Sequence, residues 1–389
     1  MYQKGEIMVN DNKRRKRRTV SGLDYSLLVV VAVLIGFGLV MLYSSSYYSA
    51  ALEHNGNETF FLSKQIVSTA LGVIAMIFFI VVDYRVWKRF TWLIYVFSLI
   101  SVLLVLTPLG LTLNGARRWL NLKVVTVQPA EIVKVAIILV MAAVISSSIR
   151  KIEGLVQILI IFVLTLIPTA MIFFLTDNFS SAIIVAAIGV IMLVVACKNN
   201  KGFIALMIGG VVGALGLLLL VGGFRASRIL VWLNPEEYSS EGGFQVLQGL
   251  YAIGSGGLFG KGLGQSVQKL GFVPEAENDM IFSIVCEELG LFGGIAVLIL
   301  FAFLIWRFMV IANNTEDLYG ALIVVGVMAH IAVQVLLNVA VVTNTVPNTG
   351  ITLPFISYGG TSVVFLLSEI GLVLSVARYG RKRQEVQER

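Results

Sequence analysis

The residue best suited to chemistry in this chain is Asp279, which directly precedes an apolar run. Met280, Ile281 and Phe282 follow it at once, so we expect its carboxylate to lie against apolar surface. A carboxylate at the mouth of a membrane helix is costly to desolvate, and such a residue marks a functional site by default. A single desolvated acid, its pKa set by burial and nearby cations, suits a general base. Asp279 is therefore the candidate catalytic residue.

The acids around Asp279 fit structural roles. Glu287 and Glu288 lie eight and nine residues after it, which is roughly 12–14 Å along a helix. A two-carboxylate glycosidase arrangement drawn from this helix alone is therefore not expected. We expect these glutamates to pair with Lys134 or with hydrogen-bond donors inside the bundle. The segment 274–279 resembles a helix start, with proline in the first turn and acids near the positive helix end.

The glycine-rich stretch 254–264 has no phosphate-loop pattern. Ser255 stands where that pattern needs glycine, and Gly262 stands where it needs serine or threonine. The glycines are better explained by a tight turn or by a close approach to an anionic headgroup. This stretch is a poor candidate for a nucleotide site.

The composition indicates an integral membrane protein. Hydrophobic residues make up 58% of the chain and charged residues 13%, against roughly 25% charged in soluble domains, and the mean hydropathy is +0.91. Cys197 and Cys286 lie in or beside apolar runs, so we expect packing rather than a disulfide or a metal site. His54 and His330 are isolated in the sequence, which offers no histidine-based metal site or triad. No nucleic-acid partner is expected.

The apolar runs predict about ten membrane spans, since one span needs roughly 20 apolar residues. The fold class is therefore all-α, a polytopic membrane protein. We expect one transmembrane domain over 23–380, a basic cytoplasmic tail over 1–22 and a second cytoplasmic tail over 381–389. The approximate span centres are Ile35, Val73, Ile100, Val140, Leu164, Gly189, Leu215, Ile295, Val333 and Leu372.

The basic residues place both termini in the cytoplasm, because cytoplasmic loops carry an excess of lysine and arginine. With this topology, an extracellular loop of about 222–278 joins the seventh and eighth spans. The supporting cations are the block 13–18, Arg85, Lys88, Arg89, Arg150, Lys151, Lys198, Lys201, Arg307, Arg378, Arg381, Lys382 and Arg383.

Several basic residues fall on the outer side, against this rule. They suggest an anionic partner such as a diphosphate or a lipid headgroup. Local pairing with Glu236, Glu237, Glu241 and Glu275 is an equally open alternative. The outer cations are Arg117, Arg118, Lys123, Arg225, Arg228, Lys261 and Lys269.

Two further segments are expected to line the site. The segment 344–362 combines Pro347 and Pro354 with glycines, hydroxyls and apolar residues. Irregular backbone near membrane depth must be buried in protein or line a wet cavity, so we expect it to fold back towards Asp279, with tight helix packing as the alternative. In the fourth span, Glu131 and Lys134 share a face and are expected to form an ion pair.

Taken together, these motifs resemble the SEDS family, which comprises the shape, elongation, division and sporulation proteins FtsW, RodA and SpoVE, and the FtsW and SpoVE branch above all. The resemblance covers nearly all of the spans. One departure lies at 176–181, where TDNFSS replaces a proline–aspartate stretch, and it puts in doubt any role for Asp177, whether in lining the cavity or in capping the next helix. The motifs are GARRW at 115–119, QPAE at 128–131, WLNP at 232–235, the segment 243–282, and NTVPNTGITLPFISYGGTS at 344–362.

The resemblance implies a peptidoglycan glycosyltransferase that polymerises lipid II at the outer face of the bacterial cytoplasmic membrane, in cell division or sporulation. Its implied partners are a class B penicillin-binding protein and other divisome or sporulation membrane proteins. Asp279 is its implied essential acid, and a divalent cation, Mg or Mn, is left open. Candidate substrate or diphosphate contacts are Arg117, Arg118, Lys261, Lys269, Gln245, Glu275 and Ser357, and candidate cavity residues are Glu131, Lys134, Pro347, Pro354 and Glu288.

Two other function classes remain open at this stage. A lipid II transporter would also have about ten spans with intramembrane charges. The distinctive polar motifs gather at the outer face, however, whereas a carrier needs a midplane site that is accessible from both sides. A scaffold that only recruits the synthase through its external loops is the third possibility.

Overall fold

A computed structural model describes most of the chain, in six ranges. The predicted span around Leu215, the basic block 13–18 and the loop cations Arg150, Lys151, Lys198 and Lys201 lie outside the described residues. The described ranges are 22–113, 116–123, 125–148, 155–196, 224–238 and 242–387.

Nine helices in these ranges are long and apolar enough to cross a membrane. Each contains one of the predicted span centres, so nine of the ten predicted spans are confirmed as helices. They are α1 (Tyr25–Glu53), α2 (Phe60–Val81), α3 (Thr91–Leu104, preceded by the 3-10 helix η1, Tyr84–Phe90), α4 (Pro129–Ser148), α5 (Leu155–Leu175), α6 (Phe179–Ala196), α10 (Ile281–Asn314), α11 (Leu318–Val342) and α12 (Thr361–Gln387).

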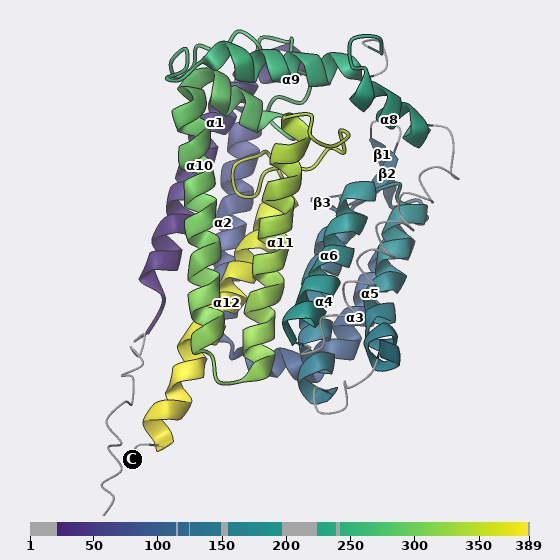
Figure 1. Cartoon of the computed structure of the whole chain (residues 1–389), viewed down its shortest axis with the longest axis vertical. Helices are drawn as coiled ribbons and strands as arrows, with labels where there is room; N and C mark the ends of the chain where they lie inside the picture. Colours follow the sequence, from purple (N-terminus) through teal and green to yellow (C-terminus); the bar gives the residue numbers. More distant parts are fainter. Residues whose placement is uncertain are drawn as a thin grey trace, which may run out of the picture.

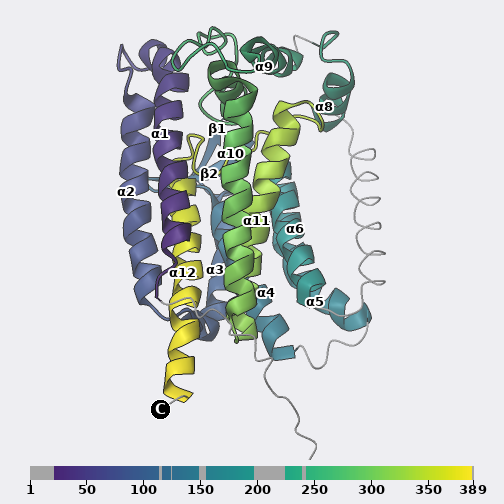
Figure 2. The ribbon, with the colours of Figure 1, turned by 60° about the vertical axis from the view of Figure 1, so that its left-hand side comes forward.

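Two short helices and three strands lie towards one end of the bundle (Figures 1 and 2). α8 (Phe224–Leu233) and α9 (Gly243–Gly256) lie across this end. The connection between α3 and α4 forms a small antiparallel sheet in the order β1-β2-β3, made of Gly110–Leu113, Ala116–Asn121 and Thr126–Val127. The sequence analysis expected only helices and missed this sheet.

The opposite end of the bundle holds the start of α1 and the end of α12 (Figure 1). Arg307 of α10 forms an ion pair there with Asp24, the residue that caps α1. At the same end, the Tyr84 hydroxyl of η1 donates to Asp317 at 3.0 Å. The cations Arg307 and Arg85 thus lie at the end of the bundle where α1 begins (Figure 1).

The core of the bundle lies around α4 and α11, which are buried over most of their length. Helices that are apolar on all sides are expected in such positions. α2 packs along α12 through small residues. A Cβ at Gly72 would lie 2.6 Å from Leu367, and one at Gly371 would lie 2.6 Å from the Met76 carbonyl oxygen. Glycine therefore allows this close helix approach.

The irregular segment 343–360 between α11 and α12, called the return segment below, enters the bundle. A Cβ on Gly38, near the middle of α1, would lie 2.4 Å from the Phe355 carbonyl oxygen. The Tyr358 amide donates to the Glu277 carbonyl oxygen at 2.8 Å. The return segment is thus buried in protein and folds back towards Asp279, as predicted from its composition.

Candidate active site around Asp279

Asp279 lies in a turn directly before α10, at the end of the bundle opposite the start of α1 (Figure 1). The segment 274–280 consists of turns, and α10 begins only at Ile281, so the helix start expected at Pro274 is wrong. The physical reason is Glu275, whose φ of 55° lies in the left-handed region. Its carbonyl oxygen accepts from the Asn278 amide at 3.0 Å and the Met280 amide at 3.4 Å, which closes a turn in place of a helix.

The backbone of Asp279 is anchored by Asn338 of α11. The fully buried Asn338 amide nitrogen donates to the Asp279 carbonyl oxygen at 2.8 Å and to the Ile351 carbonyl oxygen at 2.7 Å. It therefore joins the catalytic candidate to the return segment. The carboxylate itself receives one side-chain hydrogen bond, from Gln245 Nε2 of α9 to Oδ1 at 3.3 Å.

The surroundings of Asp279 favour a neutral carboxyl group. Burial, and then the charge of Glu275, raise the pKa of Asp279 to about 7, although the Gln245 hydrogen bond opposes them. Burial likewise raises the pKa of Glu277 to about 7. Within the described part of the chain, no lysine or arginine forms an ion pair with Asp279. Such an acid can gain and lose a proton near neutral pH.

A chain of polar contacts leads from Asp279 to a cation. Gln245 Oε1 accepts from Asn348 Nδ2 at 2.9 Å, and the Asn348 carbonyl oxygen accepts from Arg228 of α8 at 3.1 Å. Arg228 stands in the sequence as one of several basic residues on the outer side, and nothing in its local pattern singled it out. Only the fold brings it next to the return segment.

Arg118 lies close to Arg228. Its guanidinium donates to the carbonyl oxygens of Thr176 at 3.3 Å and Asp177 at 2.7 Å. Burial, and then the charge of Arg228, lower the pKa of Arg118. Asn178, not Asp177, caps α6, because its Oδ1 accepts from the Ser181 amide at 3.1 Å.

Arg117 and Ser357 bind backbone within the protein. Arg117 donates to the Gly110 and Leu106 carbonyl oxygens, both at 3.3 Å, and so ties β1 to the end of α3. The Ser357 hydroxyl donates to the Asn278 carbonyl oxygen at 2.6 Å and accepts from the Leu353 amide at 2.8 Å. Ser357 thus holds the return segment beside Asp279, in the part of the return segment that also contains Pro354, while Pro347 lies half-buried nearer α11.

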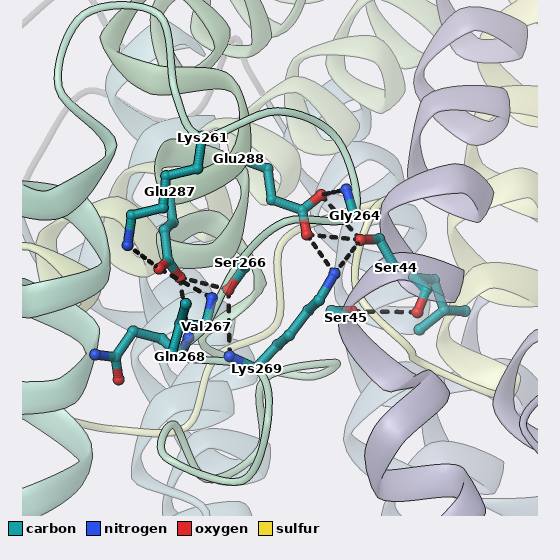
Figure 3. A network of polar contacts seen from close by, with 11 residues as sticks. Ser44, Ser45, Lys261, Gly264, Ser266, Val267, Gln268, Lys269, Glu287 and Glu288 are labelled. Atoms are coloured by element: carbon teal, nitrogen blue, oxygen red, sulfur yellow. Dashed lines mark hydrogen bonds and ion pairs between the residues drawn. The ribbon is translucent and has the colours of Figure 1, made fainter.

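Lys269 and Lys261, two predicted diphosphate contacts, are engaged by glutamates of α10 (Figure 3). Lys269 Nζ lies 2.7 Å from Glu288 Oε1 and 2.9 Å from the Ser44 hydroxyl of α1, and both charged side chains are fully buried. Lys261 Nζ lies 2.7 Å from Glu287 Oε1. Pairing therefore accounts for these cations, although with partners that the sequence analysis did not name.

Backbone amides complete the coordination of the two glutamates. The Gly264 amide donates to Glu288 Oε2 at 2.9 Å, and the Val267 amide donates to Glu287 Oε1 at 3.2 Å (Figure 3). The expected alternative of pairing with Lys134 is wrong. Lys134 lies 2.6 Å from Glu131, which confirms the ion pair predicted within the fourth span.

A buried polar stripe on α11 lies below Asp279, and the sequence analysis missed it. His330, Gln334 and Asn338 recur every four residues, so they share one helix face. Gln334 Nε2 donates to the Thr352 carbonyl oxygen at 3.0 Å, and its Oε1 lies 3.4 Å from Lys134 Nζ.

The same stripe contacts a carboxylate of α12, Glu369, through His330. Gln334 Oε1 lies 2.9 Å from His330 Nε2, and His330 Nδ1 lies 2.7 Å from Glu369. The ring of His330 therefore has Gln334 on one side and Glu369 of α12 on the other. Both His330 and Glu369 are almost without exposure inside the bundle, where ionisable side chains pair with one another.

A metal ion was left open by the sequence analysis. Across the described residues, no three His, Cys, Asp or Glu side chains come together as a metal site would require. The chemistry below is derived from the chain's own side chains.

The chain matches the family model FTSW_RODA_SPOVE, described as a cell cycle protein, over residues 25–382. It is 38% identical over 360 residues to stage V sporulation protein E of Bacillus subtilis (strain 168), and the alignment covers 92% of this chain and 98% of that protein. It is 34% identical over 367 residues to a protein of Trichlorobacter lovleyi named probable peptidoglycan glycosyltransferase FtsW, with 93% of this chain and 95% of that protein covered.

The fold also matches a solved structure. A chain from the work described as "Structural coordination of polymerization and crosslinking by a peptidoglycan synthase complex" superposes with a TM-score of 0.76 at 26% identity. The match covers 92% of this chain and 98% of the other. The range of the family model, residues 25–382, includes all the elements that surround Asp279.

Proposed function

Since this chain belongs to the FtsW–RodA–SpoVE (SEDS) family, we propose that it is a peptidoglycan glycosyltransferase that polymerises lipid II into glycan strands. The proposed place of reaction is the outer face of the bacterial cytoplasmic membrane. The observation that carries the mechanism is Asp279, a buried acid with a pKa raised to about 7, without a cationic partner in the described residues, and anchored from α9, α11 and the return segment.

In the proposed reaction, Asp279 is the general base. Its carboxylate takes the proton from the sugar 4-hydroxyl of one lipid-linked saccharide. The oxygen then attacks the anomeric carbon of a second, and the bond from that carbon to the diphosphate oxygen breaks, so the electron pair leaves with the polyprenyl diphosphate. A base whose pKa lies near the working pH is efficient in this step. Gln245, which donates to Oδ1, holds the carboxylate in position.

The leaving diphosphate needs positive charge, and preorganised cations are the usual source of such stabilisation. Arg118 and Arg228 are our candidates, because they lie close together and because Arg228 is linked through Asn348 and Gln245 to Asp279. This assignment moves the diphosphate contacts away from Lys261 and Lys269, which are neutralised by Glu287 and Glu288.

We propose a class B penicillin-binding protein, which would crosslink the new strands, as the partner of this polymerase. The support is the similarity to a chain from a complex described as coordinating polymerisation and crosslinking. Other division or sporulation membrane proteins are further candidates, given the relatives named for those processes.

The carrier alternative has less support. A carrier needs a polar site within the membrane that opens to both sides. The ionisable residues deep in the bundle are instead paired with one another and almost without exposure, as in Glu131–Lys134 and His330–Glu369.

The test is reconstitution of the full chain in liposomes with purified lipid II, with and without the class B partner. Glycan products are resolved on a gel, and headgroup translocation is measured in parallel. We expect polymer to form and to depend on Asp279. Translocation of the headgroup without any glycan product would contradict the proposal and favour the carrier.

A further inference from the structure

The loop over 257–272, between α9 and the turn before α10, buries a lysine and exposes several large apolar side chains. Lys269, with 2% exposure, points inward, whereas Phe259 is 79% exposed. The other exposed large apolar side chains of this loop are Leu258, Leu263, Val267, Leu270 and Phe272, and among its polar side chains Lys261 and Gln265 are also exposed. Lysine is almost never fully buried unless it is paired, and Lys269 is paired with Glu288.

The backbone of this loop is joined to α10 where that helix is broken. Gly290 has a φ of 69° and leaves the helical conformation. Around this break, the Leu291 amide donates to the Gly257 carbonyl oxygen at 2.9 Å, and the Phe292 amide donates to the Leu258 carbonyl oxygen at 3.2 Å.

Backbone amides of the loop also donate hydrogen bonds to carbonyl oxygens of α10. The Lys261 amide bonds the Glu287 carbonyl oxygen at 3.0 Å, and the Gly262 amide bonds the Glu288 carbonyl oxygen at 2.9 Å. The backbone groups freed by the break are therefore satisfied within the protein. Non-helical backbone at membrane depth is tolerated only in this way.

The length of α10 sets the depth of the contact. The helix has 34 residues, which is more than the roughly 20 needed to cross a hydrocarbon core of about 30 Å. Arg307 marks the end where α1 begins, since it pairs with Asp24. Counting roughly 20 residues back from Arg307 reaches Glu287, so the loop lies beside the outer part of the membrane-spanning length.

The apolar surface of the loop continues onto α10. The Phe259 and Phe292 rings lie 5.2 Å apart between centroids. From Phe292, exposed Ile295 and Ile299 extend the same apolar surface down the helix. A helix face of this kind in a membrane protein contacts lipid.

We propose that the loop over 257–272 is embedded in the outer leaflet, with Phe259 and its apolar neighbours among lipid acyl chains. The occupant of this surface is thus the hydrocarbon of the bilayer itself. In that environment a lysine or glutamate has no water, which explains why Lys269 and Glu288 are neutralised inside the protein (Figure 3). The segment that hydropathy assigns to an extracellular loop is in part a membrane-embedded element.

The test measures depth with single cysteines. Cys197 and Cys286 are replaced by serine and alanine, and Phe259→Cys in the full chain is labelled with an environment-sensitive fluorophore and reconstituted in phosphatidylethanolamine–phosphatidylglycerol vesicles. Two matched controls are Glu58→Cys, exposed in the turn after α1, and Ile299→Cys on the exposed face of α10. Quenching is compared between iodide in water, lipid with a nitroxide near the headgroup, and lipid with a nitroxide deep in the chain.

We expect the label at 259 to be quenched several-fold more by the shallow nitroxide lipid than by iodide. The label at 299 should respond to the deep nitroxide, and the label at 58 to iodide. Quenching at 259 by iodide alone, as at 58, would overturn the proposal. Protection at 259 from every quencher would also overturn it, because it would indicate cover by protein. The readout does not depend on polymerising activity, so it is independent of the proposed function.

Discussion

Two buried carboxylates on neighbouring parts of one segment have opposite surroundings. Glu288 has no exposed surface and receives Lys269, Ser44 and the Gly264 amide. Asp279 is 7% exposed and receives one side-chain donor, Gln245. The cost of desolvating Glu288 is offset by its partners, whereas that of Asp279 is offset only in part. The complete pairing of Glu288 stabilises the structure, and the incomplete pairing of Asp279 leaves a carboxyl group that can exchange a proton.

The largest expected effect on the polymerisation rate comes from replacing Asp279. Asp279→Asn should lower the polymerisation rate by about 10²–10⁴-fold, the range for loss of a general base. Thermal stability should be unchanged or higher, because the variant no longer buries a charge. Gel analysis of glycan products measures the rate, and a thermal unfolding scan measures the stability. Glu277→Gln is the matched control, and full activity in Asp279→Asn would remove Asp279 from the mechanism.

Breaking the Lys269–Glu288 ion pair should lower the stability of the protein. Glu288→Gln leaves the buried Lys269 charge without its carboxylate, so we expect a loss of about 3–5 kcal/mol in the free energy of unfolding. The double variant Glu288→Leu with Lys269→Met should recover most of this loss, since replacing a buried pair by apolar groups is often neutral. Unfolding of the three proteins in the same detergent provides the comparison. A wild-type melting temperature for Glu288→Gln would show that the pair contributes little.

Asn338 tests whether anchoring of the Asp279 backbone matters for rate. Asn338→Leu leaves the carbonyl oxygens of Asp279 and Ile351 without their donor, which costs about 1–3 kcal/mol for an unsatisfied buried group. We expect kcat to fall more than KM rises, because the base loses its position. A melting temperature lowered without any change in kcat would limit Asn338 to a purely structural role.

The smallest effect is a shift in the pH profile. Because the pKa of Asp279 is raised to about 7, activity should rise with pH through that value as the base ionises. The stability contribution runs the other way. It is present below the ordinary aspartate pKa and is lost as pH rises through about 7.

Two variants test whether the neighbours of Asp279 set the midpoint of this pH profile. Since the charge of Glu275 raises the pKa of Asp279, Glu275→Gln should move the activity midpoint to lower pH, and Gln245→Leu should move it to higher pH. Rates measured from pH 5 to 9 on the two variants give the direction. An unmoved midpoint in both would mean that another group controls the profile.

Much of the fold followed from sequence because membrane spans are determined by local hydrophobicity. The nine described spans and the Glu131–Lys134 pair depend on short-range patterns, a run of roughly 20 apolar residues and an i,i+3 spacing. The burial of the return segment followed from the need to satisfy its backbone. Asp279 was also identified from a local pattern, because a charge next to an apolar run is costly to desolvate whatever the tertiary structure.

The partners of the charges were decided only by the tertiary structure. Lys269 meets Ser44, 225 residues away along the chain, and Arg228 reaches the return segment from α8. Sequence shows that a buried charge needs a partner but does not say which one, because long side chains of several loops offer the same chemistry. The choice depends on how the helices pack. That packing paired two predicted substrate cations, Lys261 and Lys269, with glutamates of α10, and it left Asp279 without an ion-pair partner among the described residues.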